Sequence, residues 1–287
     1  MVERWVSKAL AVGPGLVVST GVTSMVGAVL PPAAGFVLFV GGLLVAGVLL
    51  AGWGEAWAAR LLTRSRPARP GELSVLAPAV TMLCWAGLGP PLVGLRVRDG
   101  ERAVAAAGLG RRTVIVSSGL LAAVGDGTLP QDQGAAVIGH AAALIRGGWV
   151  RSDAVIAFWS LPWRFLHAAA MVVAGVGRRV PLTSFAWRFR GVVIAVAVVQ
   201  SVLQGQAGLA SLIGALGVVS YAMPVWERRW QQVTLQAGDR ALADAGLAGP
   251  WVAFLRRCPS TPALRARIQD LDGSATPARS IGLVGVR

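Results

Sequence analysis

The segment GLLAAVGDGTLPQDQGAAVIGHAAALIRGG, residues 119–148, guides the interpretation of the whole chain. Immediately before it, residues 114–117 form a short apolar run with β-branched side chains, which predicts a strand. Thr128 and Asp132 are typical of a helix start, and residues 133–146 then follow helical spacing. The sequence therefore predicts a strand and a turn that lead into a helix.

The predicted helix carries His140, one of the two histidines in the chain. A zinc peptidase of the His-Glu-x-x-His type needs two histidines four residues apart on one helix face. It also needs a glutamate after the first histidine to activate the metal-bound water. Here Ala141 stands at the glutamate position and Leu144 at the second histidine position. We therefore predict no catalytic residue and no metal site, and interpret His140 as a hydrogen-bonded core histidine.

The composition is typical of a membrane protein. Hydrophobic residues make up 55% of the chain and charged residues only 14%, whereas soluble domains carry about 25% charged residues. The net charge of +14 would suit nucleic acid, but a nucleic-acid-binding protein is not usually so apolar. We therefore expect the lipid bilayer as a partner, no nucleic acid, and arginines in loops next to the membrane.

The first membrane hairpin is expected near the N-terminus. Residues 9–54 contain no charged residue, and as one helix they would be about 69 Å long, enough for two crossings of a hydrocarbon core of about 30 Å. Pro31 and Pro32 mark the turn between the two spans. Four arginines follow in residues 60–70, so we expect both ends of the hairpin to face the cytoplasm.

A second pair of membrane segments is predicted at 154–177 and 191–223. Only the second is uncharged throughout, because Arg164 interrupts the first. Two crossings would place the arginines between the segments outside, against the positive-inside tendency. We favour two crossings; the alternative is that 154–177 lies in the interface and 191–223 forms a re-entrant hairpin near 205–208.

The order of these segments resembles the HtpX-like family of integral-membrane zinc metalloproteases. Two N-terminal spans are followed by a basic linker, a short helix, a strand, and the stretch TVIVSSGLL at 113–121, which is similar to the family's strand and turn. The helix at 133–146 then corresponds to the family's zinc-binding helix. Thr261-Pro262, Arg267-Ile268 and Leu271 resemble a late family pattern. A neighbouring family of membrane sensor metallopeptidases shares the strand–turn–helix core and is the alternative.

The resemblance implies a role for five positions, most of them altered. His140 matches the first zinc-binding histidine, Ala141 the catalytic glutamate and Leu144 the second histidine. In the C-terminal helix, Leu235 occupies the position of the third ligand, and Asp239 matches an aspartate four residues later. We expect Leu144 and Leu235 to pack together in the space of the metal, and Asp239 to pair with its neighbour Arg240.

The expected fold is an α-helical integral membrane protein with about four membrane segments and a small α+β metalloprotease-like cytoplasmic domain. The predicted divisions are an N-terminal hairpin (1–58), a basic linker (59–71), the first part of the metalloprotease-like domain (72–150), the second membrane pair (151–224), the domain's C-terminal helices (225–271) and a flexible tail (272–287).

The function that we expect is that of a catalytically inactive membrane pseudopeptidase, a binding, assembly or regulatory subunit for a protein or peptide partner in the plasma membrane. The strand at 113–117 would offer an edge to an extended peptide, a binding mode that needs no zinc, and no zinc cofactor is expected. The alternative is an active membrane zinc metalloendopeptidase with unorthodox ligands. A transporter or channel subunit is disfavoured because only about four spans are available.

Overall fold

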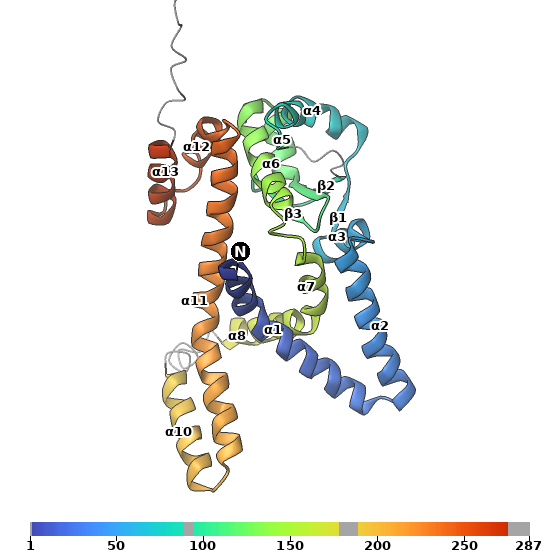
Figure 1. Cartoon of the computed structure of the whole chain (residues 1–287), viewed down its shortest axis with the longest axis vertical. Helices are drawn as coiled ribbons and strands as arrows, with labels where there is room; N and C mark the ends of the chain where they lie inside the picture. Colours follow the sequence, from blue (N-terminus) through green and yellow to red (C-terminus); the bar gives the residue numbers. More distant parts are fainter. Residues whose placement is uncertain (1, 89–93, 178–188, 275–287) are drawn as a thin grey trace, which may run out of the picture. The chain divides into compact units, whose positions relative to one another are not determined.

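The computed structural model describes residues 2–88, 94–177 and 189–274 (Figure 1). The chain divides into two compact units, which we describe separately. The first contains Met1–Ala46 and Ile156–Val233, and the second contains Gly47–Val155 and Thr234–Arg287. The first unit is helical in its described part, and the second combines helices with a four-stranded sheet.

In the part of the chain that the structure describes, three helices are long and apolar enough to cross a membrane, by length and composition. They are α1 (Val2–Val29), α2 (Pro32–Ala51) and α11 (Ala207–Asp244). This finding agrees with the predicted helical membrane protein and with its N-terminal hairpin. The turn of that hairpin is tight, because a Cβ on Gly35 would lie only 2.5 Å from the carbonyl oxygen of Gly27.

The predicted segment 154–177 is not one helix. It forms α7 (Asp153–Trp159) and α8 (Leu161–Gly177), and neither is long and apolar enough to count among the candidate spans. Within the first unit α8 packs on α1. The Trp159 indole N–H donates a hydrogen bond to Thr20 Oγ1 at 2.9 Å, and the Trp163 backbone N–H donates to Ser19 Oγ at 3.1 Å.

The segment 191–223, predicted as one membrane crossing, is not one continuous helix. The chain forms α10 (Arg190–Leu203), turns at Gly205 with a φ of +74°, and then begins α11. The two helices run side by side (Figure 1). Their contact is close, because a Cβ on Gly217 of α11 would lie 2.7 Å from Ile194 Cγ2 of α10. The turn lies where the re-entrant alternative had placed it.

The sheet of the second unit has the strand order β1-β2-β4-β3. The strands are β1 (Ser65–Pro67), β2 (Gly94–Arg98), β3 (Ala106–Leu109) and β4 (Thr113–Ser117). β4 is parallel to β2 and antiparallel to β3, and β1 is antiparallel to β2. The strand predicted at 113–117 is present, but β4 lies between two other strands. The expectation that it offers an edge to a peptide is therefore wrong, and β3 is the outer strand on that side.

Helices cover both faces of this sheet. The side chains of Val97, Val114 and Val116 pack on one face in a core shared with α4 (Pro70–Trp85), α5 (Ser118–Gly125) and α6 (Gln131–Arg146). α3 (Glu55–Thr63) contacts β1 and β4. Because strand side chains alternate between faces, Arg96 and Ile115 belong to the opposite face. α12 (Ala248–Leu255) and α13 (Pro262–Ser274) follow α11, and α12 packs on α6.

Candidate functional site

α6 carries His140 into the middle of the second unit. The helix begins two residues earlier than predicted, and all its residues from 133 to 145 are buried. This follows from its sequence, because glycine, alanine and β-branched residues surround His140 and allow close packing on several sides. His140 is itself only 8% exposed, so its ring nitrogens need partners within the protein.

A partly buried ion pair lies beside the His140 ring. Asp239 on α11 accepts two hydrogen bonds from the guanidinium group of Arg267 on α13, one to each carboxylate oxygen. The indole N–H of Trp251 on α12 donates a third hydrogen bond to Asp239 Oδ1 at 2.8 Å. The guanidinium carbon also lies 5.4 Å from the Trp251 ring centre. The carboxylate thus joins three C-terminal helices.

His140 completes this cluster. Its Nε2 lies 3.5 Å from Asp239 Oδ1 and 3.4 Å from Arg267 Nη2, and the ring stacks on Trp251 with centroids 5.0 Å apart. Nε2 is also 3.4 Å from the Leu235 carbonyl oxygen, so whether it donates or accepts depends on the tautomer. Hereafter His140, Asp239, Trp251 and Arg267 are called the polar cluster. It ties α6 to α11, α12 and α13.

Gly238 makes the contact between α6 and α11 possible. A Cβ at this position would lie 2.3 Å from His140 Nε2 and 2.6 Å from its Cδ2. The imidazole therefore occupies the space that any other residue would fill with its side chain. A glycine in the middle of a helix normally lowers helix stability, and here the close approach of the imidazole ring explains it.

The three positions that the resemblance equates with metal ligands, His140, Leu144 and Leu235, differ in the burial of their side chains. Leu144 is buried in the core, but Leu235 is 40% exposed and is not part of that core. The structure therefore does not bury Leu235 as the expected packing against Leu144 requires. Ala141 is buried on α6, where its carbonyl oxygen would lie 3.0 Å from a Cβ on Gly108 of β3. The outer strand thus packs directly on α6.

The polar cluster does not match the donor set of a catalytic zinc site. Such a site uses three protein ligands and an open position for water. Within the described ranges, no three His, Cys, Asp or Glu side chains gather in a group that could hold a metal ion. Asp239 already accepts hydrogen bonds from Arg267 and Trp251, and the positively charged Arg267 lies where a dication would have to approach His140.

Comparison with protein-family models, curated proteins and solved structures finds no match. The functional interpretation therefore rests on the residues and geometry of the chain itself.

Sequence reasoning identified two of the four residues of the polar cluster. His140 and Asp239 are brought together as the resemblance implies, but the ion-pair partner of Asp239 is Arg267 rather than Arg240, which is exposed. The sequence places Arg267 only in the late pattern of the resemblance, and it gives no local signal for Trp251. The glycine just before Asp239, inside a predicted helix, was the one local signal of a close approach.

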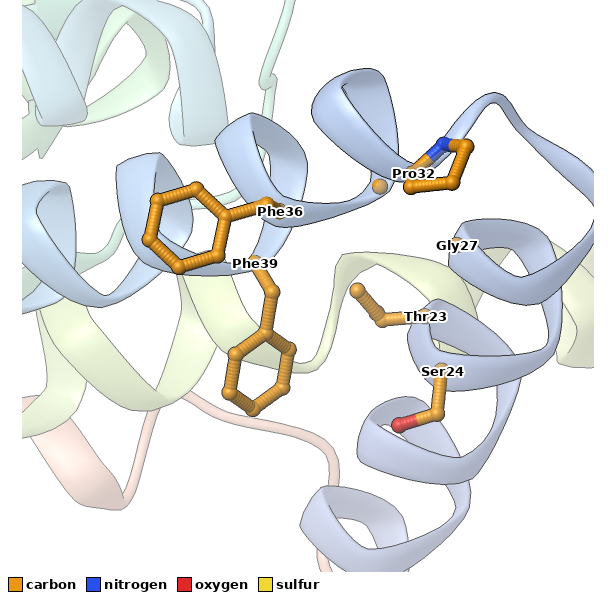
Figure 2. A pocket seen from close by; sticks show the side chains of 7 residues that line it. Thr23, Ser24, Gly27, Pro32, Phe36 and Phe39 are labelled. Atoms are coloured by element: carbon orange, nitrogen blue, oxygen red, sulfur yellow. The ribbon is translucent and has the colours of Figure 1, made fainter.

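The structure also has a hollow of about 290 Å³ between α1 and α2, next to their turn (Figure 2). Thr23, Ser24, Phe36 and Phe39 line it together with glycines and a proline. No acidic, basic or histidine side chain lines the hollow, so we assign it no chemistry.

Proposed function

We propose that this chain is a catalytically inactive membrane pseudopeptidase that binds or assembles with a peptide or protein partner. The observation that carries the proposal is the Arg267 guanidinium group, which lies 3.4 Å from His140 Nε2 and forms an ion pair with Asp239. A cation fixed at that position opposes a metal ion. In addition, the Ala141 methyl group cannot act as a base for water.

The outer strand β3 supports the proposal that the protein binds peptides without cleaving them. The Ser117 N–H donates to the Ala105 carbonyl at 3.0 Å, and Ala107 and Leu109 stand opposite Ile115 and Thr113 of β4. In an antiparallel pair, hydrogen-bonded positions alternate. The backbone groups of Ala106 and Gly108 are therefore directed away from β4, where an extended peptide would add a further strand.

We further propose that the protein resides in the plasma membrane with the second unit on the cytoplasmic side. Arginines between α2 and α4 support this orientation, because cytoplasmic loops near spans carry an excess of basic residues. The partner that we propose is then a cytoplasmic segment of another protein.

Incubation of the purified full chain with an array of unstructured peptides tests this function. We expect the protein to retain a subset of peptides and mass spectrometry to find them uncut. Ala106→Pro removes one outward N–H without touching the pairing with β4, so it should weaken retention at an unchanged melting temperature.

A matched proline control is available in α13. Ala263→Pro lies in the exposed first turn of that helix, where proline is tolerated, and it should leave retention unchanged. Cleaved peptides would instead support the active peptidase with unorthodox ligands. Equal retention by the parent and Ala106→Pro would show that β3 is not the binding strand.

A further inference from the structure

The outer strand β3 is held in place at three points. Just before it, the Ala105 N–H donates to Ser117 Oγ at 3.0 Å. Along the strand, Gly108 packs on α6, where a Cβ would lie 2.8 Å from Ile145 Cγ1. After the strand, the chain turns at Gly110 with a φ of +68°, and this turn contacts the segment that joins α2 to α3. The third point therefore connects β3 to a candidate membrane span.

The carboxylate of Glu55 holds the turn after β3 against α3. Glu55 is the first residue of α3 and is only 6% exposed. One of its oxygens accepts a hydrogen bond from the backbone N–H of Arg111 at 2.7 Å, and the other accepts one from the backbone N–H of Arg112 at 3.1 Å. A buried carboxylate is costly without such donors. The turn therefore cannot move away from α3 without removing the hydrogen bonds that stabilise the charge of Glu55.

The side chain of Arg111 connects the same turn to the end of α2. Its Nη2 donates a hydrogen bond to the Leu50 carbonyl oxygen at 2.9 Å. The last four carbonyl groups of a helix have no partner within that helix, and here the guanidinium group of Arg111 supplies one. The turn after β3 is thus bonded both to the last residues of α2 and to the first residue of α3.

Two glycines allow this close approach, one from each segment. A Cβ on Gly110 would lie 2.5 Å from the carboxyl carbon of Glu55. A Cβ on Gly52, just after α2, would lie 3.0 Å from Arg111 Cδ. Both glycines also have a positive φ, +68° and +89°, which other residues rarely adopt. The sequences of both segments are therefore suited to the same contact.

We propose that Glu55 and Arg111 are positioning residues that couple the end of α2 to the outer strand β3, so that the bilayer around α2 regulates peptide binding. α2 is about 30 Å long, and a helix of this length changes its tilt when the bilayer becomes thicker or thinner. The contacts of Leu50 and Glu55 transmit this change to the turn, and the turn shifts the outward backbone groups of Ala106 and Gly108. A peptide that adds to β3 needs these groups in line. The inference rests on the peptide binding at β3 that is proposed above.

Amide hydrogen exchange of the full chain in nanodiscs tests the coupling without a peptide. Discs of short-chain and of long-chain phosphatidylcholine supply a thin and a thick bilayer. We expect the exchange rates of Ala107 and Leu109, which pair with β4, to differ at least about fivefold between the two bilayers, the lower end of the usual coupling between sites. Arg111→Gln should remove this difference, whereas the matched control Arg112→Gln, an exposed neighbour in the same turn, should keep it.

The Arg111→Gln protein should fold normally. Within the described ranges, Nε of Arg111 is buried without a hydrogen-bond partner. The substitution therefore removes an unsatisfied polar atom together with the hydrogen bond to Leu50, and the melting temperature should stay close to that of the parent. A lost response to bilayer thickness at an unchanged melting temperature separates coupling from a general loss of structure.

Glu55→Gln gives a second, independent readout. A glutamine side chain has one acceptor oxygen, so one of the two backbone hydrogen bonds is lost. Exchange at Leu109 should then rise about tenfold in both bilayers, the effect of losing one hydrogen bond to a charged group. The matched control is Glu72→Gln, because Glu72 also accepts a backbone hydrogen bond, from the Arg69 N–H at 2.7 Å, but lies near β1 at the opposite edge of the sheet. It should leave exchange at Leu109 unchanged.

A peptide that the parent retains in the array described above serves as the probe for binding. Its dissociation constant should change with bilayer thickness in the parent and not in Arg111→Gln. If the array retains no peptide, the proposed function fails, while exchange in the two bilayers still decides the coupling. Equal exchange of the parent in both bilayers, or the same response in Arg111→Gln, would overturn the coupling. Exchange that follows thickness at a constant dissociation constant would overturn the regulation of binding.

Discussion

At the scale of single residues, the contact between His140 and Gly238 determines how closely α6 and α11 approach. A Cβ added at Gly238 would lie 2.3 Å from Nε2 of the His140 imidazole. Gly238→Ala should therefore destabilise the protein by about 1–3 kcal/mol through overpacking. In a His140→Ala background the same change should stabilise it by about 1 kcal/mol, since alanine is the better helix former.

The measurement is the thermal unfolding of the four proteins of this double-mutant cycle in detergent. A Gly238→Ala change that destabilises both backgrounds equally would contradict the contact with His140. The two single variants alone would not decide the matter, because each also alters helix propensity or leaves buried polar groups without a partner.

The residues of the polar cluster differ in how far the sequence could predict them. His140 and Asp239 belong to local patterns within predicted helices, so each was found from its own segment. Their true partners are Trp251 on α12 and Arg267 on α13, and these contacts depend on how the two helices fold back on α11. The neighbouring Arg240 was the obvious partner in sequence, yet residues one apart on a helix do not face each other.

At the scale of elements, one arginine joins three parts of the second unit. Arg66 of β1 donates to Glu72 of α4 at 2.6 and 2.8 Å and to Asp99, just after β2, at 2.7 and 3.0 Å. The hydrogen bond from Arg66 lowers the pKa of Glu72 from 4.5 to about 2. Because the folded-state pKa is the lower one, this contribution to stability is present above pH 4.5 and is lost as the pH falls toward 2.

Thermal unfolding between pH 4.5 and 2 measures this contribution. The parent should lose stability more steeply than Glu72→Gln on acidification, and the two melting temperatures should converge near pH 2. The difference should be modest, because Glu72 is partly exposed and exposed pairs contribute little. Parallel curves for the two proteins would contradict the assigned role of Arg66.

The turn between α10 and α11 explains why the sequence predicts one segment at 191–223 where the structure has two helices. Residues 191–223 are uncharged throughout, and a long uncharged run is the pattern that predicts a membrane span. Gln204, Gly205 and Gln206 interrupt this apolar run, and only glycine adopts the φ of +74° at Gly205 without strain. By contrast, β4 and α6 were predicted well because both patterns are short, strongly apolar and bounded by clear start signals.

At the scale of the whole molecule, the polar cluster restricts the topology. His140 and Asp239 lie 3.5 Å apart, so the chain between them must cross a membrane an even number of times. We expect α10 and α11 to be the two crossings and α8 to lie in the interface. α10 is about 21 Å long, which is shorter than a hydrocarbon core of about 30 Å, so a crossing by α10 needs local thinning of the bilayer. Arg190, at the start of α10, is then expected on the cytoplasmic side, in agreement with the positive-inside tendency.

Single cysteines test this topology in a background without Cys84 and Cys258. A membrane-impermeant thiol reagent on intact cells should label Gln206→Cys in the turn after α10. It should not label Asp126→Cys, an exposed position of the second unit. Protection at both positions would instead indicate a re-entrant α10–α11 hairpin.

We propose that Arg267 and Asp239 complete the surroundings of His140 without a metal ion. Elemental analysis of the purified full chain tests it most directly. After dialysis against zinc and removal of excess metal, we expect less than one zinc in ten protein molecules, with the same value for the parent and His140→Ala. One zinc per chain in the parent, lost in His140→Ala, would contradict the claim.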